Sequence, residues 1–250
     1  MTNQLLTALK NVPNEYKSIP FWSWNNSLDE NELVKQIREM KSANIGGFIM
    51  HARTGLKDEY LGEKWFSCVE ACLKEARKLK MEAWVYDENG WPSGFVGGKL
   101  LENYDFRARF LEHKVGAFDP EAYCVYVACE GGYKRVTEPQ NGVDVYENVY
   151  LRVSPANTDI LNPAVVDAFI KETHEKYYER FKDYFGKELV GFFTDEPQYY
   201  RWATPFAPAA AEAFTENGED IRDGLIWLFK SDVRGYAFRE KYYAEHNRLY

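Results

Sequence analysis

Two segments of the sequence place a pair of adjacent acidic side chains at the end of an apolar run. Asp87 and Glu88 follow the run AWVY, and Asp195 and Glu196 follow the run GFFT. Proteins rarely bury carboxylates without partners, so we expect each pair at the end of a buried strand. Paired carboxylates suit the hydrolysis of glycosidic bonds, in which one is the general acid and the other is the base or nucleophile.

Pro197 bears on the backbone of the second pair. The residue before a proline is disfavoured in the helical region, so we expect Glu196 to be extended at the end of its strand. The structural alternative for this segment is a polar strand end that caps the next turn. Because other apolar runs in the chain also end in polar residues, we favour a functional interpretation.

Further polar side chains end the run IGGFIMHAR. His51 would donate a hydrogen bond to a sugar hydroxyl, and Arg53 would pair with Asp87 or Glu196 and lower the pKa of that carboxyl. His51 as a structural histidine is the alternative. For Asp87 and Glu88, binding of substrate hydroxyls or metal ligation stands beside a solvated loop closed by an Asx-turn.

Aromatic residues are unusually frequent, with 7 Trp, 18 Tyr and 16 Phe making up 16% of the chain. Sugar rings stack on aromatic planes, so this content fits carbohydrate recognition, and it fits an aromatic core equally well. Trp22, Trp24 and Trp91 are candidate stacking platforms, with packing as the alternative for each. Asn25 adds a polar side chain at the end of the run PFWSWN.

Predicted strands and helices alternate along the chain, with short connections between them. The predicted strands are 20–25, 45–53, 81–89 and 189–194, and the predicted helices are 27–44, 63–80 and 162–186. Ser27 or Asp29 would cap the first helix, and Asn162 with Pro163 would begin the third. The segment 113–160 carries short β-like runs, and the last 50 residues contain no convincing strand.

Parallel βα units of this kind fit an open doubly wound sheet or a (β/α)₈ barrel. The doubly wound alternative predicts a GxGxxG turn after the first strand, which is missing, and no Walker A sequence occurs. A barrel places functional groups at the carboxyl ends of several strands, which matches the polar residues at the ends of the apolar runs here. We therefore predict an α/β fold, a partial TIM barrel of the first four βα units with a β-rich insertion after strand 3.

The net charge of −8 and the pI near 5.2 argue against nucleic acid as a partner, because no Lys/Arg cluster is large enough to follow a phosphate backbone. No apolar run approaches the roughly 18 to 20 residues of a membrane span. The N-terminal segment lacks the apolar region of a signal peptide, which predicts a cytoplasmic protein. The 4 cysteines lack zinc-site spacing and are expected to be reduced.

The segments PFWSWN, LDENELVKQIREMKSANIGGFIMHARTGL, EAWVYDENGWPSGFVGG and GFFTDEPQ resemble a family of bacterial glycoside hydrolases. Its members are described as glycosyl hydrolase or α-L-rhamnosidase-like proteins with a TIM-barrel catalytic domain, related to glycoside hydrolase family 106. The resemblance runs from about Pro20 to the C-terminus, except for the β-rich insertion. It implies that residues 1–250 are the N-terminal portion of such a catalytic domain.

The resemblance also implies roles for individual residues. Glu196 would be the general acid, and the substrate-binding residues would include Asp195, Asp87, Glu88, His51 and Arg53. Calcium would be present in the active site, with no ligand residue assigned in this chain. The second catalytic carboxylate would lie on a later strand, beyond Tyr250, so that the chain is expected to be an incomplete and inactive fragment of the enzyme.

The expected partner is therefore an oligosaccharide or glycoside. A non-catalytic carbohydrate-binding or scaffold protein derived from the same barrel is the alternative from a different functional class. An α/β-hydrolase or a nucleotide enzyme is disfavoured, because neither a GxSxG elbow nor a phosphate loop occurs.

Overall fold

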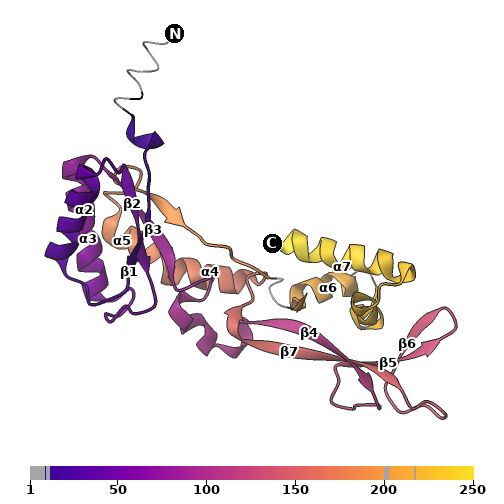
Figure 1. Ribbon diagram of the computed structural model, residues 1–250. Helices are drawn as coiled ribbons and strands as arrows, with labels where there is room; N and C mark the ends of the chain where they lie inside the picture. Colours follow the sequence, from indigo (N-terminus) through magenta and orange to yellow (C-terminus); the bar gives the residue numbers. More distant parts are fainter. Residues whose placement is uncertain (1–8, 10–11, 200–202, 217) are drawn as a thin grey trace, which may run out of the picture. The chain divides into compact units, whose positions relative to one another are not determined.

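The structure is a computed structural model that describes residue 9 and residues 12–199, 203–216 and 218–250. It is a mixed α/β structure with one parallel and one antiparallel sheet (Figure 1). The chain divides into two compact units. The first contains Met1–Lys99 and Phe169–Pro197, and the second contains Leu100–Ala168 and Gln198–Tyr250.

The first unit is built on a four-stranded parallel sheet with the order β1-β2-β3-β8. Its strands are β1 (Phe21–Trp24), β2 (Gly47–Ala52), β3 (Glu82–Asn89) and β8 (Leu189–Phe193). Its helices are α2 (Glu30–Ser42), α3 (Glu63–Leu79) and α5 (His174–Phe181), preceded by the short 3₁₀ helix η1 (Asn14–Tyr16). The predicted strands and the first two predicted helices are confirmed, with ends shifted by a few residues.

The strands follow one another in chain order without reversal, and their connecting helices pack on one face of the sheet. In Figure 1, α2 and α3 lie side by side along this face. The core there joins Ile37 of α2, Leu73 of α3 and Tyr177 of α5 to Met50 and Val85 of the strands. A doubly wound sheet would instead reverse its strand order and cover both faces.

Two of the predicted helix starts have the expected caps. The Asp29 carboxylate accepts a hydrogen bond from the Glu32 backbone N–H, which identifies Asp29, and not Ser27, as the cap of α2. The Asn162 side chain accepts from the Ala164 N–H, and Pro163 is the first residue of α4 (Pro163–Glu172).

The prediction of one long helix over 162–186 is wrong, because the helix breaks at Thr173. This residue has φ −118° and ψ −81°, and it separates α4 from α5. Its hydroxyl donates to the Phe169 carbonyl one turn earlier, a back-bond that bends helices. The break begins α5 at His174, whose ring reaches a carboxylate of the sheet.

The second unit contains a five-stranded antiparallel sheet with the order β6-β5-β7-β4-β9. Its strands are β4 (Arg107–Gly116), β5 (Cys124–Cys129), β6 (Gly132–Val136), β7 (Tyr146–Thr158) and β9 (Thr204–Phe206). Its helices are α6 (Pro208–Glu216) and α7 (Tyr236–Leu249), with the 3₁₀ helices η3 (Tyr104–Phe106), η4 (Ile221–Asp223), η5 (Leu225–Phe229) and η6 (Val233–Gly235). A further 3₁₀ segment, η2 (Val96–Glu102), links the two units in sequence.

Strand β9 contradicts the expectation that the last 50 residues contain no strand. It pairs three residues with β4, from Arg109 opposite Phe206 to Leu111 opposite Thr204. The segment is too short to show a period-2 pattern and contains Pro205, so it carries no strand signal in the sequence. Proline is tolerated there because β9 is an edge strand.

No helix within the described ranges has both the length and the apolar character that crossing a membrane requires.

Gly191 in β8 tests the packing on the sheet face opposite the helices. A Cβ at this position would lie 2.9 Å from Cζ3 of the Trp84 ring, whereas a Cβ at Gly116 of β4 would meet nothing within 4 Å. We therefore expect Gly191→Ala to lower the free energy of unfolding by about 1–3 kcal/mol through overpacking. Urea unfolding followed by tryptophan fluorescence measures this, with Gly116→Ala as the control. Equal stability of the two variants would contradict the packing described here.

Candidate functional site

The polar residues singled out from the sequence gather at the carboxyl edge of the parallel sheet. Parallel strands end at the same edge, so the residues that follow them share one rim. Asn25 follows β1 and is exposed, as is Arg53 after β2. The two acidic pairs follow at the ends of β3 and β8, all within the first unit.

Asp87 is fully buried and receives hydrogen bonds from three side chains. The Ser93 hydroxyl donates to Oδ1 at 2.6 Å, and the Thr194 hydroxyl donates to Oδ2 at 2.5 Å. Nε2 of His174 lies 3.1 Å from the same Oδ2. Asp87 therefore binds these three residues in place of Arg53, the partner suggested by the sequence, and its oxygens are directed into the protein.

Glu88 is also fully buried, and its carboxylate organises the loop that follows β3. Five backbone N–H groups donate to it, from Asn89, Gly94, Phe95, Val96 and Gly97. Burial raises the pKa of this carboxyl, and the backbone hydrogen bonds oppose that shift. Both oxygens are engaged within the protein, which favours a structural role for Glu88 over binding of a substrate.

Ser93 ties this loop to the end of β8. Its hydroxyl donates to Asp87 and accepts from the Asp195 N–H at 2.9 Å. Its own N–H donates to the Asp195 carbonyl at 2.9 Å. The two acidic pairs are thus held in a fixed relation through one serine.

The Asp195 side chain turns to the face of the sheet opposite the helices. The Tyr86 hydroxyl donates to its Oδ2 at 2.8 Å. Burial, and then this bond to a carboxylate, raise the pKa of the Tyr86 hydroxyl, which stays protonated. Asp195 is only partly buried, so it can also meet a ligand.

His51 stacks on Tyr86, with ring centroids 3.5 Å apart and planes inclined by 19°. Only 5% of His51 is exposed, and among the described residues no group hydrogen-bonds to its Nε2. Burial, and then the positive charge of Arg53, lower the pKa of His51 to about 4. The ring is therefore neutral at pH 7.

Glu196 is the exposed member of the second acidic pair. Its φ of 44° lies in the left-handed region, so the expectation of an extended backbone before Pro197 is wrong. A non-glycine residue in this region is strained, and the preceding-proline rule does not by itself select the extended form here.

The three candidate tryptophans have different environments. Trp22 and Trp24 are 9% and 2% exposed and belong to the core between the sheet and the helices, so their role as stacking platforms is not supported. Trp24 packs on Trp65 at 4.9 Å, and the Trp22 indole N–H donates to Gln36. Trp91, in the loop after β3, is 39% exposed.

Calcium does not fit the carboxylates described above. Calcium takes six to eight oxygen ligands, commonly from several carboxylates. Asp87 and Glu88 are engaged internally, and no group of three or more His, Cys, Asp or Glu side chains suited to a metal is found among the described residues. We derive no step that depends on calcium.

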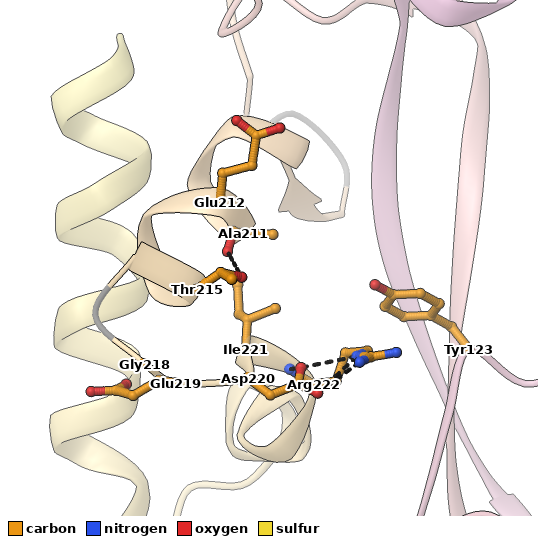
Figure 2. Close-up of a pocket in the computed structure, with 9 residues that line it drawn as sticks. All are labelled: Tyr123, Ala211, Glu212, Thr215, Gly218, Glu219, Asp220, Ile221 and Arg222. Atoms are coloured by element: carbon orange, nitrogen blue, oxygen red, sulfur yellow. Dashed lines mark hydrogen bonds and ion pairs between the residues drawn. The ribbon is translucent and has the colours of Figure 1, made fainter.

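A separate open pocket of about 550 Å³ lies in the second unit (Figure 2). Tyr123, Glu212 and Arg222 are among its lining residues. As Figure 2 shows, Arg222 is bound to Asp220, and the Thr215 hydroxyl donates to the Ala211 carbonyl. None of the candidate residues lines this pocket. Its volume alone does not assign it a ligand, and the strand-end site has the stronger chemical features.

Four residues of the site were missed in the sequence. Tyr86, Ser93, His174 and Thr194 make the hydrogen bonds that position the acidic pairs. Tyr86 and Thr194 adjoin acids that were recognised, so their position beside a strand end was a usable signal. His174 was missed because the sequence around it has the pattern of one continuous helix.

The loop around Glu88 can be tested by replacing its carboxylate with an amide. In Glu88→Gln, an NH₂ group faces backbone N–H donors in place of an oxygen, so buried donors lose their acceptor. We expect the free energy of unfolding to fall by about 2–3 kcal/mol and the amides of residues 94–97 to exchange faster with deuterium. Glu70→Gln on the exposed face of α3 is the control. Unchanged exchange at these amides would rule out the role given to Glu88.

The neutral state of His51 predicts how stability depends on pH. The unfolded chain binds a proton at this histidine as the pH falls past about 6.5, whereas the folded chain resists protonation until about 4. The stability that neutral His51 contributes is therefore present above about pH 6.5, and it is lost as the pH falls from about 6.5 towards about 4. Between pH 7 and pH 5 we expect a loss of about 2 kcal/mol that His51→Gln lacks. Urea unfolding of both proteins at the two pH values measures it, and parallel losses would refute the assignment.

Comparisons with known proteins leave the family of this chain open. No known protein family matches the chain, and no curated protein is significantly similar to it. Among the solved structures that match is a rhamnosidase from Novosphingobium sp. PP1Y, with 20% sequence identity and a TM-score of 0.35. The match covers 45% of this chain and 11% of the rhamnosidase, and a likeness this weak carries no argument about function.

Proposed function

We propose that this chain carries part of the active site of a glycoside hydrolase and that Glu196 protonates the glycosidic oxygen. The proposal includes a partial (β/α)₈ barrel as the scaffold. Support for the barrel comes from four parallel strands in chain order, with their helices on one face. Support for the location comes from the polar residues at the carboxyl edge, where barrels place their catalytic groups.

The conformation of Glu196 is the observation that carries the proposal. Of the four acids at the edge, it is the exposed one, and its backbone is in the left-handed region at φ 44°. Such strain costs on the order of 1–3 kcal/mol and is found most often at functional sites. A general acid must reach the glycosidic oxygen directly, and an exposed carboxyl on a constrained backbone meets that requirement.

The neighbouring residues take supporting roles in this proposal. Asp195, oriented by Tyr86, binds a sugar hydroxyl near the proton donor. Trp91 offers an exposed aromatic ring for stacking, and Arg53 and Asn25 add polar side chains at the same rim. Asp87 and Glu88 hold the loop and the strand end in place.

The alternative is a carbohydrate-binding protein without catalysis. Glycoside hydrolysis ordinarily uses two carboxylates that flank the scissile bond. Asp87 and Glu88 are buried and internally bonded, which leaves Glu196 and the partly buried Asp195 at this edge. Hydrolysis therefore needs a second catalytic carboxylate from another part of the protein, and without one these residues would bind a carbohydrate and not cleave it.

Leaving-group dependence tests the role of Glu196. The phenol of a phenyl rhamnoside needs a proton on its oxygen to leave, whereas the 2,4-dinitrophenolate of a 2,4-dinitrophenyl rhamnoside leaves without one. We expect Glu196→Gln to lower kcat on the phenyl glycoside by about a hundredfold to ten-thousandfold and to spare the dinitrophenyl glycoside. Glu39→Gln on α2 is the control, because that side chain is exposed on the helix.

The same assay separates the two functions. Binding of the glycosides by the unaltered protein, without release of phenol or dinitrophenol, supports the carbohydrate-binding alternative. An equal loss on both substrates in Glu196→Gln would show that this carboxyl is not the proton donor.

A further inference from the structure

The sheet face opposite the helices carries a cluster of four rings, which we call the aromatic face. It consists of Phe21 on β1, His51 on β2, Tyr86 on β3 and Phe193 on β8. The Phe21 ring contacts the other three, with centroid distances of 5.8 Å to His51, 6.1 Å to Tyr86 and 4.8 Å to Phe193.

The contact between Phe21 and Phe193 joins the two edges of the sheet. In a flat sheet, three strand spacings would separate β1 from β8 by about 14 Å. The two rings nevertheless meet at 4.8 Å, edge to face. Because Phe21 also contacts His51 and Tyr86 on the two central strands, the four rings form one continuous cluster across the sheet.

This cover leaves one polar atom without a partner. The Nε2 atom of His51 is out of contact with solvent and has no hydrogen bond from the described residues. In the neutral ring one nitrogen carries the proton and the other accepts, so Nε2 needs an acceptor or a donor according to the tautomer.

A buried donor or acceptor without a partner is destabilising, and natural proteins contain few of them. A hydroxyl group both donates and accepts, so it would satisfy Nε2 in either tautomer. The positive charge of Arg53, which acts on His51, disfavours a cation. A neutral ligand rich in hydroxyl groups fits both conditions.

Phe21 is the part of the cover that can move. It is 50% exposed, whereas Tyr86 is fully buried. The strand that carries Phe21 is anchored without this ring, because Trp22 and Trp24 lie in the core on the other face. The backbone pairing of β1 with β2 adds a second attachment. The Phe21 side chain can therefore rotate while β1 stays in place.

We propose that Phe21 is a movable cover over His51, and that a neutral polyhydroxylated ligand displaces its ring and forms a hydrogen bond between a hydroxyl group and His51 Nε2. The choice of ligand rests on the proposed carbohydrate function, whereas the cover does not. Phe21 thereby controls access to the site.

Histidine accessibility tests the cover without any sugar. Diethyl pyrocarbonate acylates neutral imidazole nitrogens, and peptide mapping reports each of the 4 histidines separately. In Phe21→Ala we expect His51 to react about tenfold faster than in the unaltered protein. Tyr178→Ala, which removes a comparably exposed ring from α5, should leave the rate at His51 unchanged. Phe21→Leu, which retains an apolar side chain, serves as a second variant with an intermediate rate expected.

Nitrogen NMR of ¹⁵N-histidine-labelled protein tests the ligand. We expect the His51 Nε2 resonance to shift on titration with methyl α-L-rhamnoside. The apparent affinity should rise about tenfold in Phe21→Ala, because without the Phe21 ring the open, binding-competent form is no longer a minority of the molecules. Sodium chloride, which offers no hydroxyl group, should leave the Nε2 resonance unchanged.

The outcomes separate the two parts of the inference. Equal reactivity of His51 in the unaltered protein and in Phe21→Ala overturns the cover. Faster reaction without any response to the rhamnoside in Phe21→Ala overturns the ligand assignment and counts against the proposed function at this edge. A response to the sugar that survives in Glu196→Gln supports the inference even where the catalytic role of Glu196 fails.

Discussion

A carboxylate removed from water must receive hydrogen bonds or lose its charge, and two successive residues at the end of β3 impose this requirement on the site. Asp87 is satisfied by side chains from three different segments, and Glu88 by backbone amides of one loop. These bonds link the start of α5 and the loop through Ser93 to the end of β3.

The requirement divides the acids at the sheet edge into two kinds. Asp87 and Glu88 on β3 are buried and bonded within the protein, whereas after β8 Asp195 is partly buried and Glu196 is exposed. Ser93 is the link, because its hydroxyl contacts Asp87 while its backbone pairs with Asp195. In our proposal the rigid support of the β3 acids is what lets Glu196 stay exposed on a strained backbone, since strain persists only where surrounding contacts hold it.

Hydrophobic periodicity and caps were sufficient to predict the strands and most helices of the first unit, because both are local properties of the chain. Asp29 as a cap is an example. The break at Thr173 was not predicted, because the helical pattern of the sequence continues across it, and the bond of His174 to a carboxylate 87 residues away has no local sequence signal. Strand β9 was missed for a similar reason, since its pairing with β4 is determined by tertiary contacts.

The candidate site was predicted in its location but not in its division of roles. The positions of acids after apolar runs placed the site at the strand ends. Which acids face inward depends on the donors that surround them, and those come from distant segments. The period-2 pattern of a strand predicts that Trp22 and Trp24 lie on the same face of β1. Whether that face is buried depends on which face of the sheet the helices cover.

A crystal structure of the chain with a bound non-hydrolysable thio-rhamnoside would test the central claim most directly. We predict the sulfur bridge within hydrogen-bond range, about 3 Å, of the Glu196 carboxyl, with Asp87 and Glu88 still bonded to Ser93 and the loop amides. A sugar that contacts Asp87 or Glu88 directly, or one that occupies the pocket beside Tyr123 and leaves the strand ends empty, would contradict the account.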